Sequence, residues 1–304
     1  MTDIVDSPAP VARRERIKLS WWDSINKFGD VGIAVWAWVM IAFLYLPIAV
    51  LIIFSFNQQR LNVKWTGFTT EWYWMEQKSY GVGVLHDAEL IKAFQNSIVI
   101  GLLSTILAVV IGVLGAFALE RFEFRSKTVW DGLNYTKIII AEIVAGVSTL
   151  VFFVKVQEVF MDYLGWNVFP LGFRTVLIAH VAWSVPFVVV IVRARLKGFD
   201  HALEEAGEDL GSTPTGVFFR ITMPVIAPGI LAAALLAFTL SFDDFITTFF
   251  VTGPQFNTLP VVIWARVRMG ITPEINAIST IMVLLSFTIV TFLEVKAHIS
   301  DDIA

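Results

Sequence analysis

The chain alternates long runs of apolar residues with shorter polar segments. Six of the runs approach or reach the roughly 20 residues that a helix needs to cross the hydrocarbon core of a bilayer. The runs contain few charged residues, so the pattern predicts transmembrane helices. We therefore predict an all-α membrane protein with six transmembrane helices. The predicted spans are residues 33–54, 97–119, 138–154, 175–192, 223–242 and 275–293.

The polar segment between the fourth and fifth runs, residues 198–224, has a pattern of its own, and we call it the interhelical segment. Its residues favour two short helices separated by a turn. Ala206 and Leu210 are four positions apart and share one face of the first helix, which Gly211 can end in a left-handed conformation. The second helix has an apolar side formed by Phe218, Phe219 and Ile221. Such a segment is suited to docking a soluble partner.

The composition also indicates a polytopic membrane protein. Of 304 residues, 57% are hydrophobic and 16% are charged, and the mean hydropathy is +0.73, which is too apolar for a soluble domain of this size. A net charge of −4 and a pI near 5.6 argue against nucleic-acid binding, which requires a basic face. The sequence contains no cysteine, which excludes disulfides, thiolate catalysis and sulfur-ligated metal sites.

The distribution of Lys and Arg between the loops predicts the orientation of the spans. If both termini lie in the cytoplasm, the inner segments hold 14 of these 22 residues (5, 4, 4 and 1) and the outer segments hold 8 (4, 2 and 2). Positive charge is enriched on the cytoplasmic side. We therefore predict cytoplasmic N- and C-termini and a cytoplasmic interhelical segment. Arg121, Arg125 and Lys127 are explained by this topological role, and contact with a cytoplasmic partner is the alternative.

Three regions follow from this arrangement. Residues 1–32 form a cytoplasmic tail in which basic residues at 13–18 precede Trp21 and Trp22, a combination typical of a helix in the inner headgroup layer. Residues 33–297 form the six-helix domain, and residues 298–304 form a short cytoplasmic tail. A cleaved signal peptide is the alternative for the N-terminus, but the first apolar run is 22 residues long and lacks a small-residue cleavage site.

Small residues at helical spacing predict close helix contacts in two of the spans. Small side chains let a second helix approach closely in a membrane, where lipid provides no hydrophobic drive for helix association. In the second run they are Gly101, Thr105, Ala108, Gly112, Gly115 and Ala116, and in the fifth they are Gly229, Ala233 and Ala237.

Five residues of the interhelical segment have the spacing of a known motif: Glu205, Ala206, Gly211, Ile221 and Pro224. On these residues the chain resembles the transmembrane permeases of binding-protein-dependent ABC importers. Gly207 and Met223 stand where that family usually has Ala and Leu. The resemblance implies the type I ABC importer permease (MetI-like) fold. It also implies that Glu205, Ala206, Gly207, Gly211, Ile221 and Pro224 couple the chain to an ATP-hydrolysing subunit. An ordinary amphipathic loop between two helices is the alternative.

The same resemblance implies a set of partners. They are a second permease subunit that completes a heterodimer, a dimer of ATP-binding cassette ATPases and a periplasmic substrate-binding protein, assembled in the lipid bilayer of a bacterial inner membrane. The sequence has no GxxxxGK[ST] phosphate-binding loop, so we expect ATP to bind to the partner ATPase and expect no cofactor in this chain. The chain pairs no nucleophile with a base, so we expect a transport subunit without catalytic residues.

Two further segments resemble the polyamine (spermidine and putrescine) branch of that family. The resemblance implies polyamine import by alternating access. The alternatives are import of another small amine or amino-acid-like solute, such as 4-aminobutyrate, an opine or an aminophosphonate, and a self-sufficient secondary carrier. The first segment contains Ser55, Phe56, Asn57, Trp65, Gly67, Phe68, Thr69, Thr70, Trp72 and Tyr73, and the second, residues 241–277, contains Asp243, Asp244, Gly253, Pro254, Pro260 and Pro273.

Four ionisable residues in or beside the apolar runs, Glu142, His180, Asp243 and Asp244, are candidate substrate-pathway residues. An unpaired carboxylate near the bilayer centre costs about 2.5–3.5 kcal/mol, so Glu142 is expected to line a pathway or to bond to a neighbouring helix. Asp243 and Asp244 follow the fifth run, at the negative end of its helix dipole, where a carboxylate needs another stabilising group. A substrate cation is our interpretation, and an ion pair with Arg266 or Arg268 is the alternative. For His180 the alternative is a structural hydrogen bond.

Overall fold

The structure is a computed structural model that describes residues 20–59, 64–76 and 81–301. The chain divides into two units, Met1–Leu51 and Ile52–Ala304, and each is described by itself. The described part of the first unit belongs to helix α1 (Ser20–Phe54), which carries the first predicted span. The basic residues 13–18, expected to lie in the headgroup layer, fall outside the described residues.

The second unit is built from helices, with two short bridges between extended residues. Helices α3, α6 and α9 have the most extensive contacts with one another in it. In chain order its elements are α2 (Glu71–Trp74), the 3-10 helix η1 (Val84–His86), α3 (Ala88–Arg121), α4 (Lys127–Ile139), α5 (Glu142–Leu164), α6 (Phe173–Lys197), α7 (Ala202–Asp209), α8 (Pro214–Val217), the π-helix η2 (Phe218–Thr222), α9 (Met223–Phe242), α10 (Ile246–Val251), α11 (Leu259–Val267) and α12 (Pro273–Asp301).

All six predicted spans correspond to helices. Among the described residues, five helical stretches are long and apolar enough to cross a membrane, and they are Gly32–Phe54, Ala88–Arg121, Glu142–Leu164, Phe173–Lys197 and Pro214–Phe242. The shorter apolar stretch Pro273–Thr288 begins α12 and corresponds to the sixth.

The predicted start of the third span at residue 138 is wrong. Ile140 and Ala141 adopt extended conformations, which end α4 at Ile139 and let α5 begin at Glu142. Glu142 therefore occupies the first turn of its helix instead of a position inside it. A carboxylate is favoured at a helix N-terminus by the free backbone N–H groups and the helix dipole.

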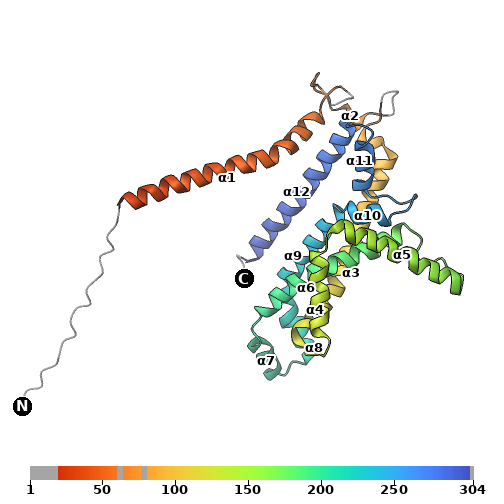
Figure 1. The fold of residues 1–304 in the computed structure, drawn as a ribbon. Coiled ribbons are helices and arrows are strands. Elements are labelled where there is room, and N and C mark those ends of the chain that lie inside the picture. Colours follow the sequence, from red (N-terminus) through yellow and green to blue (C-terminus); the bar gives the residue numbers. More distant parts are fainter. Residues whose placement is uncertain (1–19, 60–63, 77–80, 302–304) are drawn as a thin grey trace, which may run out of the picture. The chain divides into compact units, whose positions relative to one another are not determined.

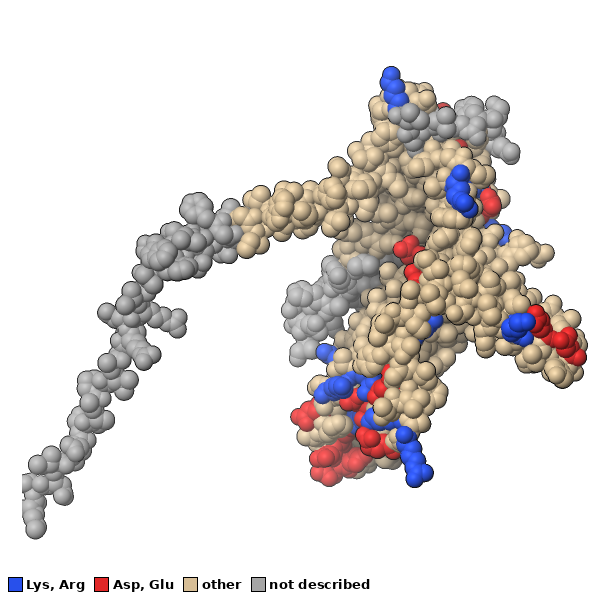
Figure 2. Space-filling model, in the orientation of Figure 1, with Lys and Arg blue, Asp and Glu red and all other residues tan. Residues whose placement is uncertain are grey.

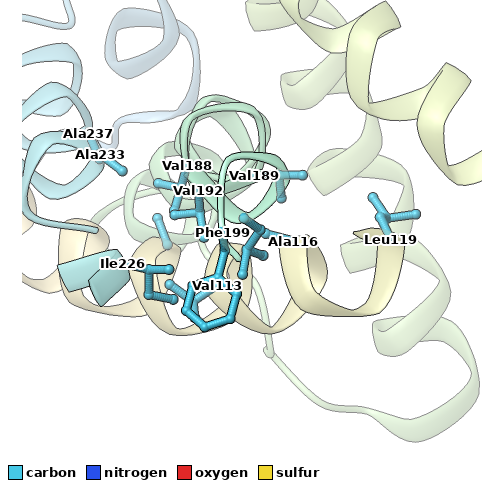
Figure 3. Close-up of a cluster of buried hydrophobic side chains, with 12 residues drawn as sticks. Val113, Ala116, Leu119, Val188, Val189, Val192, Phe199, Ile226, Ala233 and Ala237 are labelled. Carbon is cyan, nitrogen blue, oxygen red and sulfur yellow. The ribbon is translucent and has the colours of Figure 1, made fainter. Parts of the chain in front are cut away.

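Helices α3, α6 and α9 lie side by side and form the centre of the second unit (Figure 1). Figure 3 shows the buried side chains where they meet, which include Ala116 of α3, Val188 of α6 and Ala237 of α9. A Cβ atom at Gly112 would lie 2.6 Å from Cβ of Val188, so this approach of α3 to α6 requires glycine. Ala233 and Ala237 are buried in the same cluster. Close packing at both predicted small-residue faces is confirmed.

Short helices lie at the two ends of this bundle. Helices α7 and α8 lie at one end, and α2 and α11 lie at the other (Figure 1). Figure 2 shows Lys, Arg, Asp and Glu gathered around the α7 end, whereas most of the surface between the two ends is uncharged. An uncharged belt between two charged ends is what a bilayer-spanning protein needs.

Candidate functional site

The interhelical segment forms two short helices separated by a left-handed turn, as predicted. Helix α7 ends at Asp209, and Gly211 has a φ of +84°. The Gly211 N–H donates to the Glu208 carbonyl at 2.8 Å, and the Ser212 N–H donates to the Gly207 carbonyl at 3.1 Å. These are the two hydrogen bonds of a Schellman C-cap. A side chain at position 211 would be strained in this conformation, which explains the glycine.

After the turn, the segment runs without interruption into α9. Thr213 caps α8 by accepting a hydrogen bond from the Gly216 N–H, and the π-helix η2 then connects α8 to α9. Pro224 has no N–H and its ring would crowd the carbonyl of Arg220 in an α-helix. A wider π turn before the proline relieves that crowding. The second half of the interhelical segment is therefore continuous with a span.

Gly207, a departure from the family motif, lies at an internal contact. A Cβ atom at this position would be 2.5 Å from Cδ1 of Ile221 and 3.3 Å from Cγ2 of Val217. Because glycine has no side chain, α7 can pack directly on α8 and η2, the helical turns that lead into α9. Gly207 and Ile221 thus hold the two parts of the segment together.

The remaining motif residues on α7 face solvent. Glu205 and Ala206 are exposed, and Leu210 is 88% exposed. Phe219 from the second helix is 68% exposed. An exposed Leu beside a carboxylate forms a face that can bind another protein, and we call Glu205, Ala206 and Leu210 the docking face.

An ion pair attaches the interhelical segment to α3. Arg121, the last residue of α3, donates to both carboxylate oxygens of Glu204, at 2.6 and 2.9 Å. Thr222 also donates to Glu204, and the Arg121 guanidinium lies 5.6 Å from the ring centre of Phe199. The Arg121 hydrogen bond holds the pKa of Glu204 below its ordinary value of 4.5, against the effect of partial burial. We call Arg121, Glu204 and Thr222 the clamp.

Sequence reasoning assigned Arg121 a topological role and gave Glu204 no role. The available signal was the pair Glu204–Glu205 at the start of α7. Successive residues on a helix point about 100° apart, so two adjacent carboxylates need not have the same surroundings. The structure turns Glu204 toward Arg121 and Glu205 outward.

A second ion pair ties the other end of α3 to α11. Asp87 caps α3 by accepting from the N–H groups of Glu89 and Leu90, and it accepts from Arg266 of α11 at 2.6 and 3.2 Å. Burial raises the pKa of Asp87, but the bonds from Arg266 and from the helix N–H groups outweigh it and hold the pKa below its ordinary value. Helix α3 is therefore fixed to the interhelical segment at one end and to α11 at the other.

Asp243 and Asp244 have different surroundings although they are adjacent. Asp244 is 7% exposed, and its Oδ2 accepts from the Thr248 N–H at 2.8 Å and the Thr248 hydroxyl at 2.9 Å. The same oxygen lies 3.2 Å from Nε2 of His180. Asp243, by contrast, caps the end of α9 and is exposed. The groups that stabilise Asp244 are therefore His180 and α10, and no substrate cation is needed to explain it.

The predicted alternative, an ion pair of these aspartates with Arg266 or Arg268, does not occur among the described residues. Arg266 bonds to Asp87 and also to Glu89, at 2.5 Å. The Arg268 guanidinium lies 4.6 Å from the ring centre of Trp264. Both arginines are engaged elsewhere.

His180 is the centre of a buried hydrogen-bond network. Its Nδ1 lies 2.6 Å from Oγ of Ser241 and its Nε2 lies 2.8 Å from Oγ1 of Thr248. Ser241 in turn bonds to Ser104 at 2.8 Å. The network joins α3, α6, α9 and α10, and each of its residues is at most 7% exposed. This burial favours the structural interpretation of His180.

Glu142 lies near the two aspartates. Helix α5 packs on α10, since a Cβ atom at Gly146 would be 2.7 Å from the Phe250 ring. Glu142 is half-buried in the first turn of α5, the helix that packs on α10 just after the two aspartates. The fold thus gathers the three predicted acids at the corner between α9 and α10. Within the described residues, no group of three His, Asp or Glu side chains is placed to hold a metal ion.

Asp243 lines a cavity of about 620 Å³ between α9, α11 and α12, which we call the aromatic cavity. The Phe245 and Trp264 ring centres are 5.0 Å apart, and Phe238 and Phe242 are stacked at 5.5 Å. Small-molecule sites have volumes of about 300–1,000 Å³. A larger groove of about 790 Å³ between α3, α4 and α6 is lined by apolar residues with Asn134 and Lys137 and has no acid, so it is less suited to a cation.

Residues 108–301 match the family described as "Binding-protein-dependent transport system inner membrane component". The chain is 38% identical to the spermidine/putrescine transport system permease protein PotC of Escherichia coli (strain K12). The alignment contains 249 residues and covers 82% of this chain and 87% of that protein. It is 36% identical over 241 residues to the putrescine transport system permease protein PotI of the same strain, covering 79% and 81%.

Two solved structures share the fold. One is a bacterial ABC transporter involved in import of the acidic polysaccharide alginate, with a TM-score of 0.71, 15% identity and coverage of 92% of this chain and 98% of that one. The other is the MetNI methionine ABC transporter, with a TM-score of 0.54, 16% identity and coverage of 69% and 94%. The expected importer permease fold is confirmed.

Proposed function

The chain belongs to the family of binding-protein-dependent transport system inner membrane components, and on this premise we propose that it imports polyamines as a permease subunit of an ABC transporter. The relatives that support the substrate class are the spermidine/putrescine and putrescine permeases, each at least 36% identical over most of this chain. The family has a transport role and no catalytic one. ATP hydrolysis belongs to the partner ATPase.

The observation that carries the coupling role is the attachment of the docking face to two long helices. The face lies on a segment that is continuous with α9 and clamped to α3 by Arg121 and Glu204. An ATPase that binds this face and moves would carry the ends of both helices with it. Because α3, α6 and α9 pack as one core, such a movement favours alternating access over local bending.

We assign the finer assembly on the same basis. The chain pairs with a second permease subunit, binds an ATPase dimer through the docking face and receives substrate from a periplasmic binding protein. Its N- and C-termini and the interhelical segment lie in the cytoplasm, in agreement with the 14 of 22 Lys and Arg residues on that side.

Cation selectivity is assigned to the acids at the α9–α10 corner. Asp243 and Glu142 lie on the pathway, where a charge that leaves water needs a compensating carboxylate. Asp244 and His180 hold the corner in shape through their hydrogen bonds. The acids thus divide into two that meet the substrate and one that positions them.

Transport by proteoliposomes tests the function. The vesicles contain the chain with its second permease and ATPase, and the binding protein is added outside. We expect ATP-dependent uptake of radiolabelled putrescine or spermidine that excess unlabelled amine suppresses. Uptake of 4-aminobutyrate, an opine or an aminophosphonate in place of the amines would refute the polyamine assignment. Uptake without the ATPase would refute the importer assignment in favour of a secondary carrier.

A further inference from the structure

We propose that Arg193 is a positioning residue that transmits the movement of the interhelical segment to α4, the helix that leads into the third span. Arg193 joins the carboxylates of Glu120 on α3 and Asp131 on α4. The inference rests on the proposed function, because it extends the coupling role of the docking face. It goes further by assigning one helix that the movement reaches and the side chain that transmits it.

Helix α4 has little apolar packing to fix its position. None of its residues is buried. It lies beside α6 (Figure 1), but the groove of about 790 Å³ lies between α3, α4 and α6, and Leu133 and Lys137 of α4 line it. The helices of a globular protein are normally held by an apolar stripe that faces the core. The position of α4 therefore depends on its polar contacts.

Two polar contacts attach α4 to α6. Asp131 accepts a hydrogen bond from the Arg193 guanidinium, and Nζ of Lys137 lies 4.3 Å from the ring centre of Trp183. Asp131 and Lys137 are separated by about 9 Å along the helix axis, so the contacts hold α4 at two levels. Of the two, only the Arg193 contact joins opposite charges, and charge-assisted hydrogen bonds are among the strong ones.

The Arg193 guanidinium joins three helices. Its Nε donates to Oε2 of Glu120 at 3.2 Å, and its Nη1 donates to Oδ1 of Asp131. The Arg193 side chain is 12% exposed, so the contact is largely shielded from water. Arginine can bind two carboxylates at once because its donors form a fixed planar fork. Without Arg193, the two carboxylates that it joins would lose their shared positive partner.

Arg193 continues a series of ionic contacts that begins at the clamp. Glu120 and Arg121 are adjacent in the last turn of α3, where Arg121 binds Glu204 of the interhelical segment. The contacts thus link α7 to α3, α3 to α6 and α6 to α4. Contiguous salt-bridge networks and rigid helices transmit movement between distant sites. When the interhelical segment moves α3 and α6, Arg193 moves α4 with them.

The chain can bend directly after α4. Ile140 and Ala141 are extended, so α5 does not continue α4 as one rigid helix. Helix α5 packs on α10 and runs in a different direction from α4 (Figure 1). Hinges are formed by a few residues at the ends of helices that absorb changes in φ and ψ. Helix α4 can therefore follow α6 while α5 keeps its contact with α10.

The test is the number of polyamine molecules imported per ATP hydrolysed by proteoliposomes containing the complete transporter. The variants are Asp131→Asn, which leaves Arg193 paired with Glu120, and Arg193→Lys, with Asp131→Glu as a conservative version. Glu123→Gln is the matched control, because Glu123 lies near the same end of α3 but pairs with Lys127 and exposes 88% of its side chain. Co-purification of the subunits and ATP hydrolysis without substrate report assembly.

We expect Asp131→Asn to lower the import per ATP at least about threefold while KM for putrescine stays within about twofold of wild type, because the contact acts on movement and not on substrate binding. Arg193→Lys should also lower it, since an ammonium lacks the planar fork. Asp131→Glu and Glu123→Gln should retain more coupling. A wild-type ratio in Asp131→Asn, or an equal loss in Glu123→Gln, would overturn the role of Arg193 and leave the proposed function intact. A wild-type transporter that moves no polyamine would overturn both.

A distance measurement distinguishes positioning from a general loss of structure. The chain has no cysteine, so Thr128→Cys on α4 and Lys197→Cys on α6, both at exposed residues, carry one spin label each. In the otherwise wild-type chain, we expect electron–electron resonance to give the same label distance in the nucleotide-free and ATP-bound transporter. Asp131→Asn should make this distance broader or dependent on the nucleotide state. A distance that changes between states without Asp131→Asn, or that Asp131→Asn leaves unchanged in both states, would refute the proposal.

Discussion

Removing Arg121 should separate the movement of the interhelical segment from that of α3. Arg121→Ala eliminates both hydrogen bonds to Glu204, at 2.6 and 2.9 Å, and leaves that carboxylate with Thr222 as its remaining strong donor. The interhelical segment would then lose its ion pair with α3 and would keep apolar contacts such as that between the Phe117 and Phe218 rings, whose centres are 5.2 Å apart. We expect the variant to insert and to hydrolyse ATP with its partners, but to move less substrate for each ATP.

The geometry sets the size of the effect. Exposed ion pairs contribute about 0–1 kcal/mol, whereas removal of one partner of a fully buried pair costs about 3–5 kcal/mol. The Arg121 and Glu204 side chains are 23% and 19% exposed, which places the pair between these cases. We therefore expect a loss of about 2 kcal/mol in the free energy of unfolding, in line with hydrogen bonds to charged groups.

A double-mutant cycle isolates this contact. Arg121→Ala, Glu204→Ala and the double variant are unfolded reversibly with SDS in mixed micelles, and the coupling energy should be about 1–2 kcal/mol. The Glu123–Lys127 pair is a matched control, because it lies near the same end of α3 but exposes 88% of the Glu123 side chain. Its coupling should be smaller than that of the clamp, within the roughly 0–1 kcal/mol of exposed ion pairs. Equal coupling in the two cycles, together with normal transport by Arg121→Ala, would refute the clamp.

Three further results follow from the same geometry. Single cysteines at Glu208 and Gln255, both exposed in this cysteine-free chain, should react with impermeant thiol reagents from opposite sides of the membrane, and reaction from the same side would contradict the orientation. Asp244→Asn should lower the free energy of unfolding by about 2 kcal/mol because it disturbs a buried network, whereas Asp243→Asn should change it by less than about 0.5 kcal/mol, and equal losses would contradict the division of roles. Since the pKa of Glu204 is lowered in the folded protein, its stabilisation is complete above its ordinary value of 4.5 and is lost as the pH falls through the lower folded value. Glu204→Gln should therefore flatten the pH dependence of the unfolding midpoint at acidic pH, and an unchanged slope would show that Glu204 is not the group responsible.

The spans and the interhelical turn could be predicted from the sequence because the signals are local. A long apolar run predicts a spanning helix, and Gly211 at the end of a short helix predicts a left-handed cap. The break before Glu142 could not be predicted in the same way. Ile140 and Ala141 are apolar, and neither position is a proline that would indicate a helix end. The apolar run therefore continues across the point where α4 ends and α5 begins.

Long-range pairing explains the other differences. Asp243 and Asp244 are adjacent on a helix, so only one of them can point directly at a pathway. The residue that pairs with Asp244 in the buried network is His180, which is more than sixty positions away in the sequence. Arg121 and Glu204 are separated by 83 positions, so no local spacing indicates the pair. Sequence spacing identifies the exposed motif residues, whereas the contacts that anchor them depend on how α3, α6 and α9 pack.

The central claim is that the docking face couples ATP hydrolysis to polyamine movement, and the most direct test is the number of polyamine molecules imported per ATP hydrolysed. This ratio is measured in proteoliposomes for wild type, Glu205→Lys and Gly211→Val. Glu205→Lys reverses a charge on the docking face, and Gly211→Val strains the φ of +84° that shapes the turn. We predict that both variants insert with the second permease and import almost no polyamine. Wild-type import by both variants would contradict the account.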